Sequence, residues 1–196
     1  LNDEIHGGAD NDVILGGPGS DALYGDGGDD FIQAATSILG TEDDALHTID
    51  GGTGNDRIYG DLGADTITGG AGDDQIYARS GDDHIDAGDD DDLVIAGLGF
   101  DTVIGGWGND TIYAGTSIAG SEAVGNTIFC DRETGQPTSG DGDDLIYGDQ
   151  GEDVIDAGGG DDIVYGLAGS DTIIGGWGAD VIFAGVNQAG SPSGAA

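Results

Sequence analysis

An aspartate that returns every nine residues constrains this chain more than any other feature. The sequence divides into fifteen units of the pattern G-G-x-G-x-D-x-U-x, in which U is aliphatic. The eighth place is always Ile, Leu or Val, and the fourth is Gly except at Asp10 and Asp90. A repeat this strict over most of a chain indicates a repetitive architecture. The sixth place is aspartate in every unit: Asp12, Asp21, Asp30, Asp56, Asp65, Asp74, Asp83, Asp92, Asp101, Asp110, Asp144, Asp153, Asp162, Asp171 and Asp180.

The chemistry of one unit predicts a tight turn followed by a very short strand. Glycines at the first, second and fourth places allow backbone angles that other residues resist. In the x-U-x segment the aliphatic side chain points inward and its two neighbours point outward. Two units, or eighteen residues, then make one coil. Aspartates eighteen residues apart are therefore expected to stack from coil to coil.

Such stacks of carboxylates require a cation. Neighbouring coils lie roughly 4.8 Å apart, and two carboxylates at that distance repel by about 3.5 kcal/mol at an effective dielectric of about 20. Calcium suits the arrangement because it binds six to eight hard oxygens from carboxylates and backbone carbonyls. The chain holds 40 acidic and 3 basic residues, for a net charge of −37, which excludes nucleic acid as a partner.

The repeat resembles the RTX family, whose glycine- and aspartate-rich nonapeptides bind calcium in secreted bacterial proteins. The resemblance implies an all-β fold, a right-handed parallel β-roll (a β-helix-like solenoid) with calcium between the turns of neighbouring coils. It also implies that the ligands are the sixth-place carboxylates, including Asp3 of a partial first unit, and turn carbonyls. Asp10 and Asp90 depart from the glycine pattern, so the shape of their turns is in question although their carbonyls remain. The carbonyl ligands implied are those of Gly52, Gly54, Gly70, Gly72, Gly88, Asp90, Gly106, Gly108, Gly158, Gly160, Gly176 and Gly178.

The repeats fall into three blocks separated by two insertions. We expect a first RTX block at 1–33, an insertion at 34–50, a second block at 51–113, an insertion at 114–138, a third block at 139–183 and a tail at 184–196. Ile49 and Ile128 are expected to continue the inward aliphatic line, so that one continuous roll, a fragment of a larger protein, spans the blocks. A calcium site needs two stacked turns. The blocks therefore hold nine sites, and their edges extend the expected number to thirteen.

Histidine and cysteine suggest no further chemistry at this stage. His47 falls where an aspartate of the repeat would stand, and His6 and His84 are scattered elsewhere. No zinc-binding spacing connects them, so all three are interpreted as structural or incidental. Cys130 is the only cysteine, which excludes an intrachain disulfide. It is interpreted as a small buried hydrophobic residue.

Aromatic residues occupy fixed places in the repeat. The ninth place carries all six tyrosines, Tyr24, Tyr59, Tyr77, Tyr113, Tyr147 and Tyr165, and also Phe183. Their spacing predicts a ladder on one outer face, which either steadies the sheet by cross-strand stacking or contacts a glycan or a protein. Trp107 and Trp177 each stand in the last turn before an insertion or the tail. We expect each to pack on the segment that follows, and the alternative is sugar stacking or partner binding.

These observations predict a binding or structural module without catalytic activity. No strand-loop-helix context, helical period or nucleophile arrangement accompanies the acidic pairs, and no apolar stretch is long enough to span a bilayer. The favoured function is a calcium-binding roll that folds outside the cell after type I secretion of a bacterial protein. The expected location is therefore extracellular or at the cell surface. The alternative is an adhesin spacer or a polysaccharide-binding module.

Overall fold

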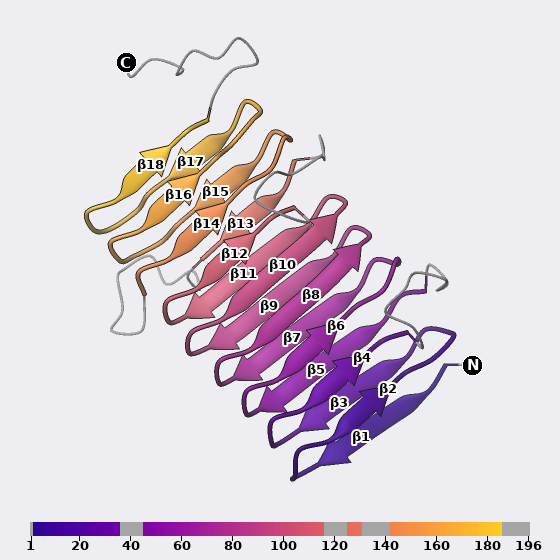
Figure 1. Cartoon of the computed structure of the whole chain (residues 1–196). Helices are drawn as coiled ribbons and strands as arrows, with labels where there is room; N and C mark the ends of the chain where they lie inside the picture. Colours follow the sequence, from indigo (N-terminus) through magenta and orange to yellow (C-terminus); the bar gives the residue numbers. More distant parts are fainter. Residues whose placement is uncertain (1, 36–44, 116–124, 131–141, 186–196) are drawn as a thin grey trace.

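The computed structural model describes residues 2–35, 45–115, 125–130 and 142–185 and shows a flat roll of two parallel sheets (Figure 1). Odd-numbered strands form one nine-stranded sheet and even-numbered strands form the other, so the chain alternates between sheets at every turn. All strand pairs are parallel. The described residues contain no helix. The predicted all-β parallel roll is confirmed.

The strands are short because each is only the x-U-x segment and, in the longer ones, the turn residues after it. The odd-numbered sheet contains β1 (Glu4–Gly8), β3 (Ala22–Asp26), β5 (Thr48–Thr53), β7 (Thr66–Ala71), β9 (His84–Asp89), β11 (Thr102–Trp107), β13 (Thr127–Phe129), β15 (Val154–Asp156) and β17 (Thr172–Ile174). The even-numbered sheet contains β2 (Val13–Leu15), β4 (Phe31–Gln33), β6 (Arg57–Tyr59), β8 (Gln75–Ser80), β10 (Leu93–Leu98), β12 (Thr111–Tyr113), β14 (Leu145–Tyr147), β16 (Ile163–Tyr165) and β18 (Val181–Phe183).

The register of the sheets confirms the eighteen-residue coil. Ile76 on β8 lies between Ile58 on β6 and Val94 on β10, each eighteen residues away. These eighth-place side chains point between the two sheets and form a single line of buried aliphatic residues. Burial of this line is the hydrophobic contribution to folding, at about 25 cal/mol per Å² of apolar surface.

The insertions do not interrupt either sheet. β5 pairs with β3 and β7, and β13 pairs with β11 and β15. Ile49 and Ile128 are fully buried and continue the aliphatic line as predicted. Each insertion therefore contributes one strand to the roll. Cys130, directly after β13, is also buried, which confirms the interpretation of this residue.

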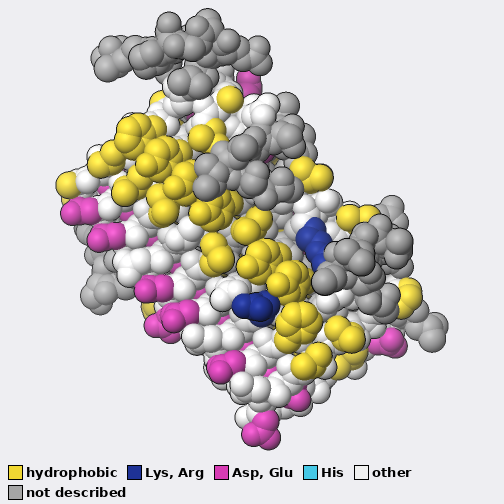
Figure 2. Space-filling model, viewed as in Figure 1, with side chains coloured by type: hydrophobic (Ala, Val, Ile, Leu, Met, Phe, Trp, Pro, Cys, Tyr) yellow, Lys and Arg dark blue, Asp and Glu magenta, His cyan; other side chains and the backbone are white. Residues whose placement is uncertain are grey.

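The aromatic ladder lies on the outer face of the even-numbered sheet. Tyr59 and Tyr77 stack with ring centroids 4.8 Å apart. A second stack continues from Tyr113 through Tyr147 and Tyr165 to Phe183, with centroids 4.8–4.9 Å apart. Figure 2 shows hydrophobic side chains gathered on one face of the roll, most densely over the C-terminal strands.

Tyr24 is the exception to the predicted one-sided ladder. It lies on β3 in the odd-numbered sheet, where its ring stacks on His6 at 4.5 Å. The reason is the first insertion, which adds the single strand β5 and so places the tyrosines of the second block on the opposite sheet from Tyr24.

The two tryptophans lie at the turns, as the repeat predicts. Trp107 ends β11 and is 41% exposed, and Trp177 is 60% exposed. Most of the insertion at 114–138 and of the tail at 184–196, which are expected to cover them, lies outside the described residues. Their packing on those segments stays a prediction.

Removing one buried side chain tests the importance of the aliphatic line. Ile76→Ala should lower the free energy of unfolding in saturating calcium by about 2–5 kcal/mol, because it leaves a cavity between two tightly spaced coils. Val13→Ala is the control, since Val13 is 73% exposed. Denaturant titration followed by circular dichroism measures both variants. Equal effects of the two substitutions would contradict the assignment of the core.

Candidate metal sites

The turns gather the sixth-place residues into two rows, one along each edge of the roll. The first row precedes the even-numbered strands and consists of Asp12, Asp30, Asp56, Asp74, Asp92, Asp110, Asp144, Asp162 and Asp180. The second row precedes the odd-numbered strands and consists of Asp3, Asp21, His47, Asp65, Asp83, Asp101, Asn126, Asp153 and Asp171. Every predicted carboxylate therefore lies in one of two continuous stacks.

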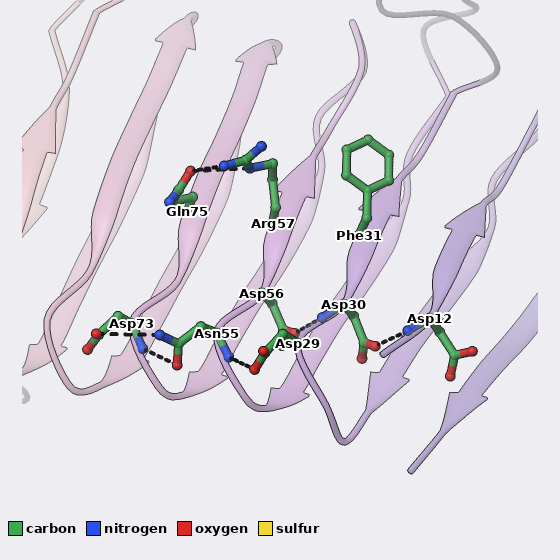
Figure 3. A pocket seen from close by; sticks show the side chains of 9 residues that line it. All are labelled: Asp12, Asp29, Asp30, Phe31, Asn55, Asp56, Arg57, Asp73 and Gln75. Atoms are coloured by element: carbon green, nitrogen blue, oxygen red, sulfur yellow. Dashed lines mark hydrogen bonds between the residues drawn. The ribbon is translucent and has the colours of Figure 1, made fainter. Parts of the chain in front are cut away.

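One carboxylate oxygen of each stacked aspartate is used within the fold. The Asp56 N–H donates to Asp74 Oδ1 at 2.7 Å, and the Asp74 N–H donates to Asp92 Oδ1 at 2.8 Å. The same bond recurs along both rows, and Figure 3 shows it between Asp12, Asp30 and Asp56. The aspartates thus satisfy backbone donors of the neighbouring coil.

In seven of the stacked aspartates, the other carboxylate oxygen is buried without a donor. Among the described residues, no hydrogen-bond partner reaches Oδ2 of several row members. A buried carboxylate oxygen in this state costs several kcal/mol unless a cation or a proton compensates it. The row members concerned are Asp21, Asp30, Asp56, Asp74, Asp83, Asp92 and Asp171.

Where the first place of a turn is glycine, its surroundings show where these oxygens point. A Cβ at Gly7 would lie 2.8 Å from both Asp12 Oδ2 and the carbonyl oxygen of Gly25, one coil on. At Gly60 the corresponding atoms are Asp65 Oδ2 and the Ala78 carbonyl, at 2.5 and 2.6 Å. Two hydrogen-bond acceptors therefore face one small space. Hard oxygens directed at a common point are the donor set that calcium prefers.

Most glycines at the second and fourth places have the positive φ that the predicted turn requires, and the described exceptions are Gly63, Gly142 and Gly151. A Cβ at Gly72 would clash with the carbonyl of Gly54, so turn carbonyls point into the space between coils. Asp90 has φ +80° and so keeps the turn, whereas Asp10, the other departure from glycine, does not have positive φ. Positive φ is found at every glycine predicted as a carbonyl ligand: Gly52, Gly54, Gly70, Gly72, Gly88, Gly106, Gly108, Gly158, Gly160, Gly176 and Gly178.

Burial makes these carboxyls weak acids in the protein chain alone. It raises the pKa of Asp74 to about 7, of Asp83 to about 8 and of Asp92 to about 9. The backbone hydrogen bond to each carboxylate lowers the pKa, and repulsion from neighbouring row members raises it further. At neutral pH the stacks therefore need either protons or cations to balance their charge.

A second ladder, of Asp and Asn side chains, runs along the edge of the first row and was not predicted from the sequence. The N–H of each member donates to the side chain of the member one coil earlier, as from Asn55 to Asp29 and from Asp73 to Asn55 (Figure 3). The signal was the recurrence of Asp or Asn at the fifth place of alternate units. The ladder is exposed and consists of Asn11, Asp29, Asn55, Asp73, Asp91, Asn109, Asp143 and Asp161.

The second row also departs from pure aspartate where the insertions enter the roll. His47 and Asn126 take the sixth place there, and both are buried. In the coil after each of them, an extra buried carboxyl, Asp61 or Asp149, stands at the second place of the turn. Sequence reasoning missed both, although the units GDLG at 60–63 and GDQG at 148–151 share the Gly-Asp signal.

The family comparison agrees with this geometry. The sequence model of the RTX calcium-binding nonapeptide repeat (four copies) matches residues 1–32, 48–76, 59–94, 68–103, 86–117, 138–173 and 156–187. The fold and its two rows of turns define a calcium-binding solenoid module. The chain belongs to the RTX calcium-binding nonapeptide repeat family. No curated protein matches the chain. Within the described residues, no helix is long and apolar enough to cross a membrane.

The raised pKa values predict that acid favours the calcium-free fold. A group whose pKa is 3.8 in the unfolded chain and about 9 when folded, as for Asp92, opposes folding increasingly as pH rises between those values. In calcium-free buffer, the β signal in circular dichroism should be larger at pH 5.5 than at pH 9. Saturating calcium is the control and should remove this dependence, because the ion binds the charged form. A calcium-free chain with more β structure at pH 9 would refute the prediction.

Proposed function

We propose that this chain is a calcium-triggered folding module of a secreted bacterial protein. The observation that carries the proposal is the stack of buried Oδ2 atoms without donors, of which those of Asp21, Asp30, Asp56 and Asp74 lie beside a turn carbonyl. Calcium bound only by the folded roll contributes its binding energy to folding. The ion would supply charge neutralisation between coils, and the sixth-place carboxylates with the turn carbonyls would hold it.

The stacked pairs support a specific number of ions within the expected range of nine to thirteen. Nine aspartate pairs stack within the blocks. Three more, Asp3 with Asp21, Asp30 with Asp56 and Asp110 with Asp144, stack at or across block edges. We therefore propose twelve calcium ions. Their 24 positive charges against −37 leave the loaded module acidic.

Export is supported by the dependence of the fold on an ion that is scarce inside cells. With a single cysteine, the chain cannot form an intrachain disulfide. Its net charge of −37 leaves far too few basic side chains to neutralise the acidic ones. In the low-calcium cytosol it would stay unfolded, which suits passage through a type I secretion channel. Outside the cell, millimolar calcium would fold it. We assign it a structural role at the cell surface or beyond, without catalysis.

One observation favours adhesion as a second candidate function. The outer face of the even-numbered sheet carries the Tyr113–Phe183 stack together with exposed Ile163, Val181 and Phe183 (Figure 2). Exposed aromatic ladders suit contact with a glycan or a protein. A glycan array on the calcium-loaded chain distinguishes this function from a purely structural module.

The primary proposal predicts a metal-dependent fold. In EGTA, circular dichroism should show a disordered chain, and millimolar calcium should produce a β spectrum. Magnesium should substitute poorly because it keeps its waters and demands a tighter octahedron. A β spectrum that survives chelation at neutral pH would contradict the proposal.

The position of an aspartate in its row should determine how much calcium binding it supports. Asp74 lies between Asp56 and Asp92, whereas Asp180 has a row neighbour only at Asp162. Asp74→Ala should therefore weaken two sites and shift the calcium midpoint of folding further than Asp180→Ala, which weakens one. Calcium titration followed by circular dichroism compares them. Equal shifts would show that sites are not shared between coils.

A further inference from the structure

We propose that His47, Asp61 and Asp65 form a binding site for one first-row transition-metal ion of the zinc class, which shares the Asp65 carboxylate with the neighbouring Asp65–Asp83 calcium pair. The site lies in the second row, where the first insertion re-enters the roll. It forms only in the folded roll, so it rests on the proposed calcium-induced folding for its assembly.

The three side chains converge on one point in the interior. One ligand atom from each lies within 4.8 Å of the others, and all three residues are buried. His47 Nε2 is 3.3 Å from Asp61 Oδ2, and both side chains are 0% exposed. Neither atom has a hydrogen-bond partner among the described residues. A buried ring nitrogen and a buried carboxylate oxygen thus face one another with no hydrogen bond between them.

Local hydrogen bonds hold the two carboxylates in place. Asp65 Oδ1 accepts the His47 N–H at 2.9 Å, and Asp65 Oδ2 accepts the Asp61 N–H at 3.0 Å. Asp61 Oδ1 accepts the Gly63 N–H at 2.8 Å, which fixes its side chain and directs Oδ2 toward the imidazole. Each carboxylate oxygen keeps a further lone pair for a metal.

The donor set selects against calcium. Calcium takes six to eight oxygens, whereas imidazole is a ligand of zinc, copper, iron and nickel. One imidazole nitrogen with two carboxylates matches the three protein ligands of an open zinc site. At the other row members an aspartate oxygen, or the amide of Asn126, takes the place of this nitrogen. The imidazole therefore changes the metal preference of this coil alone.

Asp21 is placed to orient the ring. Its Oδ2 lies 3.8 Å from His47 Nδ1 and has no hydrogen-bond partner within the described residues. A metal on Nε2 requires the proton on Nδ1, and a carboxylate on that side stabilises this tautomer. The ring then gives up the hydrogen bond that Nδ1 accepts from the Asp21 N–H at 3.3 Å.

The chain contains a matched site without the imidazole. Asp153 Oδ1 accepts the Asn126 N–H at 2.7 Å, and Asp153 Oδ2 accepts the Asp149 N–H at 3.0 Å, as in the His47 coil. Asp149 Oδ1 accepts the Gly151 N–H at 2.6 Å, as Asp61 does from Gly63. His47→Asn therefore gives the first site a residue that the roll already accommodates. Asn126→His builds the proposed site a second time.

The experiment is a zinc titration of the full chain in saturating calcium against a chromophoric chelator. The wild type should bind one zinc ion tightly, and His47→Asn should weaken that binding by about 100-fold. Asn126→His should add a second tight equivalent. His6→Asn with His84→Asn is the control for exposed histidines and should leave binding unchanged. Cobalt in place of zinc should give ligand-field absorption that His47→Asn removes.

Two results would overturn the proposal. The first is zinc binding of equal strength in the wild type and in His47→Asn. The second is a calcium-folded wild type that binds no zinc, in which case the imidazole serves only as an ion-pair partner of Asp61. Circular dichroism in calcium, recorded on the same samples, separates these results from failure of the calcium-induced fold.

Discussion

The structure depends on electrostatic repulsion between aspartates stacked at the spacing of neighbouring coils. The parallel sheets fix that spacing, so the carboxylates cannot move apart without breaking strand pairing. Burial strengthens the repulsion and raises the pKa of Asp92 to about 9. We propose that folding and cation binding are one process in this roll, because the narrow core between the sheets consists of the eighth-place aliphatic residues and a few small side chains such as Ala78.

Each turn assigns its carboxylate oxygens to different tasks. Oδ1 accepts a backbone N–H from the neighbouring coil and aligns the stack, as Asp74 does for Asp56. Oδ2 points to the first-place glycine, where a side chain would fill the space. The glycines of the repeat therefore divide two functions between them, because those at the second and fourth places permit positive φ and those at the first place leave the space beside Oδ2 open. This is why a unit of nine residues suffices for both fold and site.

The two edges and two faces of the roll are chemically unequal. One edge adds an exposed Asp/Asn ladder, and the other replaces two aspartates with His47 and Asn126 where the insertions enter. The aromatic stacks lie on the even-numbered sheet, apart from Tyr24. A uniform repeat thus supports position-specific chemistry at the coils where the repeat is broken.

The sequence by itself determined the coil length, the inward aliphatic line, the two rows of aspartates and the positive-φ turns, because each follows from a local period of nine. It did not determine which sheet Tyr24 joins, since that depends on how many strands the first insertion contributes. It also did not bring His47 to Asp61, which stands fourteen residues away at a different place of the repeat. Only the stacking of coils decides such contacts. They join residues at different places of the repeat, so the nonapeptide period does not predict them.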